Sequence, residues 1–163
     1  MLTVLTALQK CFPAFNLILM IEYRFTDTGI HERRNTMKRE DINIRDPFIL
    51  PYEGKYYLYG SRGSEVWEDN ATGLDVYVSD DLENWSEPKE IFTRTADFWA
   101  DRHYWAPEVY AYNGAFYMFA SFKSADRCRG TMVLKADKPD GKFTVHSEGT
   151  ITPPDWESLD GTL

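Results

Sequence analysis

The chain has 163 residues, of which 43% are hydrophobic and 15% aromatic, a composition typical of one globular domain. Its formal net charge is -8 and no cluster of lysine or arginine compensates for it. Such a surface would repel phosphate backbones, so nucleic acid is excluded as an expected partner. The five tryptophans and ten tyrosines suit stacking on a neutral ligand such as a sugar, although most are expected to fill β-sheet cores.

Residues 1–38 lie outside the pattern that organises the rest of the chain. Their apolar runs, Leu2–Leu8 and Phe12–Ile21, are separated by polar residues and a proline, and neither reaches the roughly 20 residues that a membrane span needs. No basic residue precedes the first run and no small-residue cleavage site follows the second, as a secretory signal would require. We therefore expect no membrane partner and interpret residues 1–38 as an extension outside the fold, with the natural start of the domain near Met37.

The stretch Asn43–Leu50 places one carboxylate, Asp46, at the entrance of an apolar strand. Pro47 has no N–H donor and a fixed φ, so it suits the first residue of a strand. A residue before proline is biased toward extended backbone, which predicts an extended Asp46. An Asp-Pro pair by itself is more often a simple turn, and Asp46 becomes a candidate for chemistry only because the pattern around it recurs.

The recurrence has an offset of 60 residues: residues 47–61 align without a gap on residues 107–121. In both copies an apolar strand runs into an Xaa-Gly turn and a more aromatic strand returns, which predicts a β-hairpin. A second hairpin follows each copy, at residues 74–94 and 131–146. The sequence therefore predicts two similar four-stranded antiparallel sheets, and four strands per repeat is the make-up of a β-propeller blade.

The connections between the predicted strands are of two kinds. Ser79–Trp85 and its counterpart Ala136–Phe143 combine turn-forming residues with a final aromatic residue, and we predict tight loops whose aromatic side chain packs against the blade. The insertions at residues 62–73 and 95–105 are longer, polar and acidic, and they contain Trp67 and Trp99. Loops of this length on a β scaffold are often functional.

Cysteine and histidine residues give no metal-site or disulfide pattern. Cys11 and Cys128 are the only cysteines, so we expect no disulfide framework, a reducing compartment such as the cytoplasm rather than secretion, and no metal or other cofactor. The three histidines are scattered, and a structural role is the more frequent one for such residues. His103 is the exception, because it precedes Trp105 and Pro107 at the predicted entrance of the second sheet.

Several motifs together resemble glycoside hydrolase family 43. They are Arg45-Asp46-Pro47 at the first blade, Trp105-Ala106-Pro107-Glu108-Val109 at the second, the Ser79–Trp85 connection, and Ser158–Leu163. The resemblance covers about residues 39–163. It implies an all-β fold of the five-bladed β-propeller type, here two blades and the start of a third, and a carbohydrate substrate. It also implies inverting hydrolysis of arabinose- or xylose-containing glycans, as in an α-L-arabinofuranosidase or a β-xylosidase.

The resemblance assigns roles to two carboxylates. Asp46 matches the general base, and Asp160 matches the residue that tunes the pKa of the acid and orients the substrate. Alignment of the blade openings places Asp46, Ala106 and Asp160 at equivalent positions, and such positions form a ring around a propeller axis. We further predict that four side chains line the sugar pocket: Trp105, His103, Trp67 and Trp99.

One part of the family pattern is absent from the sequence. Inverting hydrolysis needs a general acid roughly 6.5–9.5 Å from the base, and in the family it is a glutamate from a later blade. Glu108 is the only other carboxylate near a blade opening, and we interpret it as a structural hydrogen-bond acceptor. We therefore expect the chain to be an N-terminal fragment that is inactive alone. A related glycoside phosphorylase, which would need a basic phosphate pocket, and a noncatalytic sugar-binding propeller are the alternatives.

Overall fold

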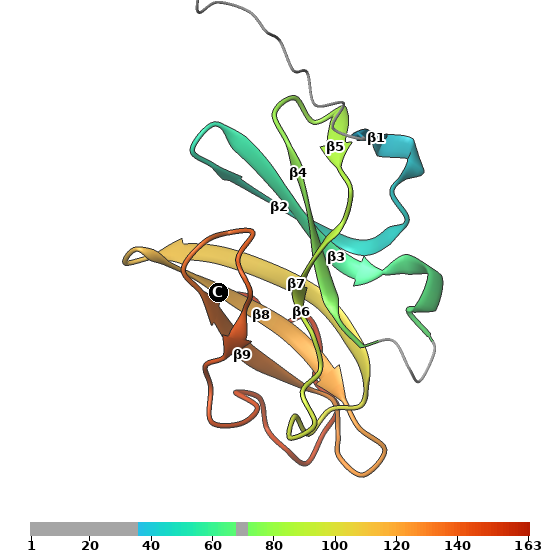
Figure 1. Ribbon diagram of the computed structural model, residues 1–163. Coiled ribbons are helices and arrows are strands. Elements are labelled where there is room, and N and C mark those ends of the chain that lie inside the picture. Colours follow the sequence, from blue (N-terminus) through green and yellow to red (C-terminus); the bar gives the residue numbers. More distant parts are fainter. Residues whose placement is uncertain (1–35, 68–71) are drawn as a thin grey trace, which may run out of the picture. The chain divides into compact units, whose positions relative to one another are not determined.

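The computed structural model describes residues 36–67 and 72–163 (Figure 1). These residues form two antiparallel β-sheets and two short 3-10 turns, η1 (Arg39–Asp41) and η2 (Gly63–Glu65). The prediction of an all-β fold is confirmed. Within the described part of the chain, no helix has the length and apolar character needed to cross a bilayer.

The first sheet has the strand order β1-β5-β4-β3-β2, with β6 also paired to β4. It has six strands where the sequence predicts four. The fourth strand that the sequence predicts, at residues 89–94, is β6, and β5 is an additional short strand that begins within the predicted Ser79–Trp85 connection. Pro88, which has no N–H to donate, separates β5 from β6. The sixth strand is β1, which pairs with β5, so the sheet begins before the predicted boundary at residue 39. The strands are β1 (Thr36–Lys38), β2 (Ile44–Tyr52), β3 (Lys55–Arg62), β4 (Leu74–Ser79), β5 (Asn84–Ser86) and β6 (Lys89–Phe92).

The second sheet has four antiparallel strands in the order β10-β9-β8-β7, as the repeat predicts. Strand β7 packs against both β2 and β3 of the first sheet, and β8 reaches β2 through the edge-on contact of Phe116 with Tyr52. In Figure 1 the three strands β7, β8 and β9 run side by side below β2 and β3. The strands are β7 (Arg102–Tyr112), β8 (Ala115–Lys123), β9 (Gly130–Ala136) and β10 (Thr144–Val145).

The two Xaa-Gly turns have nearly identical backbones. Glu53 and Gly54 have φ of 47° and 75°, and Asn113 and Gly114 have φ of 47° and 76°. Two successive residues with positive φ form the turn that matches the twist of a two-residue hairpin, and glycine takes this conformation without steric cost. The predicted hairpins are therefore confirmed in both copies.

The core lies between the two sheets and is rich in aromatic side chains. Phe92, Phe98, Tyr104 and Phe122 contact one another at ring-centroid distances of 4.8 to 5.9 Å. Tyr59 is fully buried, and its hydroxyl donates a 2.7 Å hydrogen bond to the carbonyl of Pro139. Burial raises the pKa of Tyr59, so this hydroxyl stays protonated and keeps donating.

The loop from Ser79 to Trp85 is held by one carboxylate. Asp81 Oδ1 accepts hydrogen bonds from the backbone amides of Glu83 (2.9 Å) and Asn84 (2.7 Å), and these bonds lower the pKa of Asp81. Trp85 is only 2% exposed and its indole N–H donates to the carbonyl of Leu82. The prediction that the final aromatic residue of this loop packs against the blade is confirmed, and its counterpart in the second copy, Phe143, is buried as well.

Residues 158–163 form no strand, so the expected first strand of a third blade is not formed. This segment nevertheless lies against the second sheet. The amide of Ser158 donates to the carbonyl of Arg129, and the amide of Asp160 donates to Ser121 Oγ on β8. A strand needs a neighbouring strand to accept its ladder bonds, and among the described residues this segment has none on its other side.

Candidate active site

Asp46 lies in a β-bulge of the β2–β3 hairpin. Arg45 is paired with Ser61 and Phe48 with Tyr59, so Asp46 and Pro47 together oppose the single residue Gly60. Asp46 has φ of 51°, in the left-handed region. The prediction of an extended Asp46 is therefore wrong: the extra residue of the bulge overrides the local preference of a residue before proline, at a cost of about 1–3 kcal/mol.

The two other predicted blade openings adopt the same backbone. Ala106 has φ of 46° and Asp160 has φ of 55°. Ala106 also lies in a bulge, because Trp105 is paired with Ser121 and Glu108 with Phe119. The equivalence that the sequence alignment predicts for Asp46, Ala106 and Asp160 thus holds for their backbone conformation.

Two buried serines link these openings to the preceding sheet. Ser61 Oγ accepts a 2.9 Å hydrogen bond from the amide of Ala106, and Ser121 Oγ accepts a 3.0 Å hydrogen bond from the amide of Asp160. Both serine side chains are fully buried. The Ser61 hydroxyl also donates to Asp46 Oδ2 at 3.1 Å. Asp46 and the start of the second blade are therefore held by one side chain.

The charge of Asp46 acts on the carboxyl group of Asp160. Partial burial of Asp160 raises the pKa of its carboxyl, and the negative charges of Asp46 and Glu108 raise it further, whereas the charge of Arg129 opposes the shift. Like charges raise the pKa of a carboxyl only when they lie close enough to interact.

Glu108 is engaged in structural hydrogen bonding. The Tyr110 hydroxyl donates a 2.6 Å hydrogen bond to Glu108 Oε2, and the same hydroxyl lies 2.8 Å from Thr162 Oγ1. The prediction that Glu108 is a hydrogen-bond acceptor is confirmed. Because Thr162 follows Asp160 closely, these bonds also hold the terminal segment against β7.

Three of the four predicted sugar-contacting residues form one cluster. The rings of His103 and Trp105 are stacked at 4.5 Å, and Trp67 meets Trp105 edge-on at 5.2 Å. The indole N–H of Trp105 donates a 2.7 Å hydrogen bond to the carbonyl of Val66, which fixes the ring orientation. Trp67 is 69% exposed, so an aromatic surface at the edge of this cluster is open to solvent.

Arg129 is a residue of this cluster that the sequence does not reveal. Its guanidinium lies 4.2 Å from the centre of the Trp105 ring and 3.2 Å from His103 Nδ1, and it also pairs with Glu157. It sits at the end of the β8–β9 loop, with no motif around it. The one feature of the sequence that could have indicated a role for Arg129 is its place in the β8–β9 loop, which is equivalent to the β3–β4 loop that carries Trp67.

Trp99 lies apart from the cluster. It contacts Phe98 and the guanidinium of Arg127, at 6.2 and 5.6 Å. It lines a separate cavity of about 610 Å³ together with Asp126, Arg127, Cys128, Glu148, Gly149, Thr150 and Pro154. The structure thus brings Trp67, His103 and Trp105 together and places Trp99 elsewhere.

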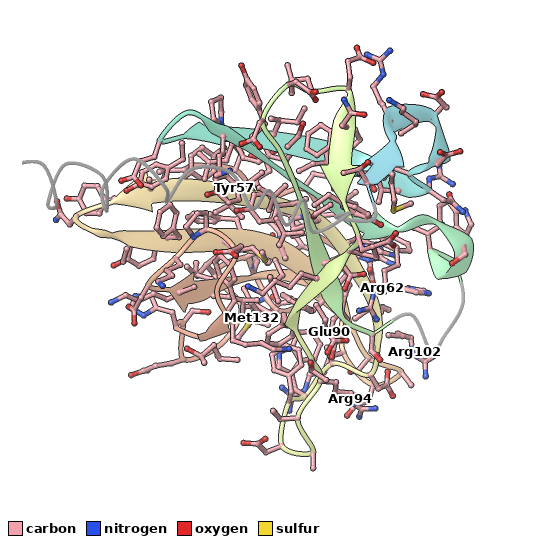
Figure 2. All side chains as sticks on the ribbon, turned by 45° about the horizontal axis from the view of Figure 1, so that its top comes forward. Tyr57, Arg62, Glu90, Arg94, Arg102 and Met132 are labelled. Carbon is pink, nitrogen blue, oxygen red and sulfur yellow. The ribbon has the colours of Figure 1, made fainter. Side chains whose placement is uncertain are left out.

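An ion-pair network joins the end of β3 to β4 and β6. Arg62, at the end of β3, makes two 2.7 Å hydrogen bonds to the Asp75 carboxylate and one of 2.9 Å to Glu90, and these carboxylates raise its pKa. Arg62 also donates to the carbonyl of Thr72, next to Gly73, whose Cα lies against the guanidinium. Figure 2 shows Arg62 and Glu90 close to each other at one end of the first sheet. Within residues 36–67 and 72–163, no group of three or more His, Cys, Asp or Glu side chains is arranged to hold a metal ion.

Comparison with known proteins gives consistent matches. The model of the family described as Glycosyl hydrolases family 43 matches residues 41–163. An extracellular endo-alpha-(1->5)-L-arabinanase 1 of Bacillus subtilis (strain 168) is 29% identical over 87 residues, which are 50% of this chain and 25% of that protein. An extracellular exo-alpha-(1->5)-L-arabinofuranosidase of Cellvibrio japonicus (strain Ueda107) is 27% identical over 89 residues, which are 50% of this chain and 23% of that protein.

The fold is similar to that of a solved endo-arabinase from Bacteroides thetaiotaomicron VPI-5482. The TM-score is 0.68 and the identity 37%, over 78% of this chain and 43% of that one. The solved relatives are β-propellers, and the two sheets described above are blades of that fold. The chain spans about a quarter of the length of the curated relatives and less than half of this solved structure.

Proposed function

The chain belongs to the glycosyl hydrolases of family 43, and from this membership we infer that the protein hydrolyses arabinofuranosidic bonds in arabinan or its oligosaccharides. One curated relative is named an endo-alpha-(1->5)-L-arabinanase and the other an exo-alpha-(1->5)-L-arabinofuranosidase, and the similar solved structure is an endo-arabinase. For this reason we propose arabinose rather than xylose as the sugar of the substrate. The sequence motifs alone did not distinguish between these two sugars.

The observation that carries the proposal is that Asp46 and Asp160 occupy blade openings with the same left-handed backbone, close enough for the charge of Asp46 to raise the pKa of Asp160. In the proposed inverting step, the oxygen of a water molecule bonds to the anomeric carbon while the bond to the leaving oxygen breaks. Asp46 takes the proton of the water, and a general acid gives a proton to the leaving oxygen. Asp46 is exposed, so water can reach its carboxylate.

Asp160 has the supporting role in this proposal. Partial burial, and then the negative charges of Asp46 and Glu108, raise its pKa. The charge of an ionised carboxylate at this position would in turn raise the pKa of a neighbouring general acid and keep it protonated. Glu108 is already bonded to Tyr110. We therefore assign the general acid to a residue other than those described, and we expect the 163-residue chain alone to hydrolyse neither arabinofuranosides nor xylosides.

The cluster of Trp67, His103 and Trp105 is the proposed sugar platform. Sugar rings present apolar C–H faces that pack on aromatic rings, and Arg129 adds a charged donor beside the stacked pair. Trp105 directly precedes Ala106, one of the three equivalent blade openings. From this position we expect the platform to lie next to the proposed catalytic carboxylates.

Substitution of the proposed base tests the function. In the full-length protein, Asp46→Asn should lower kcat on an aryl α-L-arabinofuranoside by at least about 100-fold, because the amide cannot take a proton from water. Sodium azide, which needs no base, should restore turnover. Asp137→Asn, at an exposed aspartate on the β9–β10 connection, is the control and should leave kcat unchanged. More than about a tenth of the activity in Asp46→Asn, together with no effect of azide, would exclude the proposed base.

A further inference from the structure

We propose that Ser61 is a positioning residue that holds the Asp46 carboxylate in its working orientation and couples it to the backbone of the second blade. The inference rests on the proposed role of Asp46 as the general base. Ser61 lies on β3, directly across from Arg45 and next to the bulge, and its side chain is fully buried. Solvent therefore does not reach the Ser61 hydroxyl that contacts Asp46.

The hydrogen bonds of Ser61 have only one consistent direction. An ionised carboxylate accepts hydrogen bonds and cannot donate them, so the Ser61 hydroxyl proton points to Asp46 Oδ2, at 3.1 Å. The amide of Ala106 then donates to a lone pair of Ser61 Oγ, at 2.9 Å. The donor and acceptor roles are therefore determined in both hydrogen bonds, and the two bonds form a hydrogen-bond chain from the Ala106 amide through Ser61 to Asp46. Successive hydrogen bonds of this kind polarise and strengthen one another.

This hydrogen-bond chain gives the two oxygens of the Asp46 carboxylate different roles. Oδ2 is held by Ser61, which leaves Oδ1 on an exposed side chain to receive the proton from water. A carboxylate that rotated freely would offer the correct oxygen and angle only part of the time. The bond therefore contributes pre-organisation, which acts on kcat more than on substrate binding.

The second copy of the repeat shows what the serine does without a carboxylate. Ser121 is the equivalent of Ser61, is equally buried, and accepts the amide of Asp160 in the same way. The residue equivalent to Asp46 in this copy is Ala106, which has no carboxylate to bind. The contact between blade openings thus needs only the serine acceptor, and of these two serines it is Ser61 that donates to a carboxylate.

Kinetics of four variants in the full-length protein test the proposal. Ser61→Ala should lower kcat on an aryl α-L-arabinofuranoside about tenfold with KM within about twofold, in line with the loss of one hydrogen bond to a charged group. Ser61→Thr keeps the hydroxyl and should recover most of the lost kcat. Ser61→Cys, of similar size but a weaker donor, should be intermediate and replaces Ser61→Ala if that variant does not fold. The fourth variant combines Ser61→Ala with Asp46→Asn.

The double variant separates positioning from general support of the fold. If Ser61 acts through the carboxylate, azide-supported turnover should be the same in Asp46→Asn with and without Ser61→Ala, because the group that Ser61 positions is already lost. An additional tenfold fall in the double variant, or an unchanged kcat in Ser61→Ala, would overturn the proposal. A failure of the proposed function looks different, because Asp46→Asn itself would then remain active.

Discussion

The bulge that carries Asp46 depends on the absence of a side chain at Gly60. A Cβ added at Gly60 would lie 2.8 Å from the carbonyl oxygen of Arg45 and 3.0 Å from Cδ1 of Ile44. The closer atom belongs to the backbone, so rotation of a side chain cannot relieve the contact. Gly60→Ala should therefore displace the β2 backbone at the bulge and with it Asp46.

The expected magnitude follows from two opposing effects. Overpacking of a buried site costs about 1–3 kcal/mol, and replacement of glycine by alanine returns about 0.4–1 kcal/mol through the entropy of the unfolded chain, so the net loss should be roughly 1–2 kcal/mol. Gly149→Ala is the matched control, because a Cβ there meets no atom within 4 Å. That control should leave stability unchanged or raise it slightly.

Urea unfolding and kinetics of the full-length protein measure both consequences. Gly60→Ala should lower the free energy of unfolding by the amount above and should also lower kcat, because the Ser61–Asp46 bond depends on the same bulge. If Gly60→Ala is as stable as the parent and equally active, the bulge is not tightly packed and the reasoning is refuted. A stable but inactive variant would support the link between the bulge and Asp46.

Two other predictions concern binding and pH. Trp105→Ala should raise KM several-fold with little change in melting temperature, because the ring belongs to the sugar platform. Trp99→Ala should change KM less, because that ring lines a cavity away from the platform. A large fall in melting temperature with unchanged kinetics would instead assign Trp105 to the core. Asp160 has a raised pKa in the folded protein, so its ionised form opposes folding once the pH is above that pKa, and the opposition vanishes when both states are protonated at low pH. Asp160→Asn should therefore raise the melting temperature at neutral pH but not near about pH 3, and a lower melting temperature at neutral pH would contradict the shift.

Sequence reasoning succeeded where the signal is local. The hairpin turns at Glu53-Gly54 and Asn113-Gly114 were predictable, because the Xaa-Gly pair requires a backbone that few other pairs adopt. The burial of Trp85 against the blade was predictable, because Trp85 is a large apolar residue at the end of a short run of polar turn residues. These features depend on residues that are close in the chain.

The features that sequence reasoning missed depend on distant residues. Arg129 reaches Trp105 from a loop on the other side of β8, and the hydroxyl of Tyr59 reaches Pro139, 80 residues away. The left-handed backbone at Asp46 comes from the register of β2 against β3, which a local rule about residues before proline does not contain. Contacts of this kind can be inferred only once the pairing of the strands is known.

The backbone strain at Asp46 is a requirement of the fold before it is a requirement of catalysis. Strained residues cluster at active sites, which invites the conclusion that the left-handed conformation exists to aim the carboxylate. Ala106 argues against this, because it has the same conformation, at φ of 46°, with no functional group to aim. Ala106 and Asp160 share a hydrogen bond from the backbone amide to a buried serine of the preceding sheet. This hydrogen bond links each of these two openings to the preceding sheet. Catalysis, as proposed, uses a carboxylate at two of the three blade openings that share the left-handed backbone.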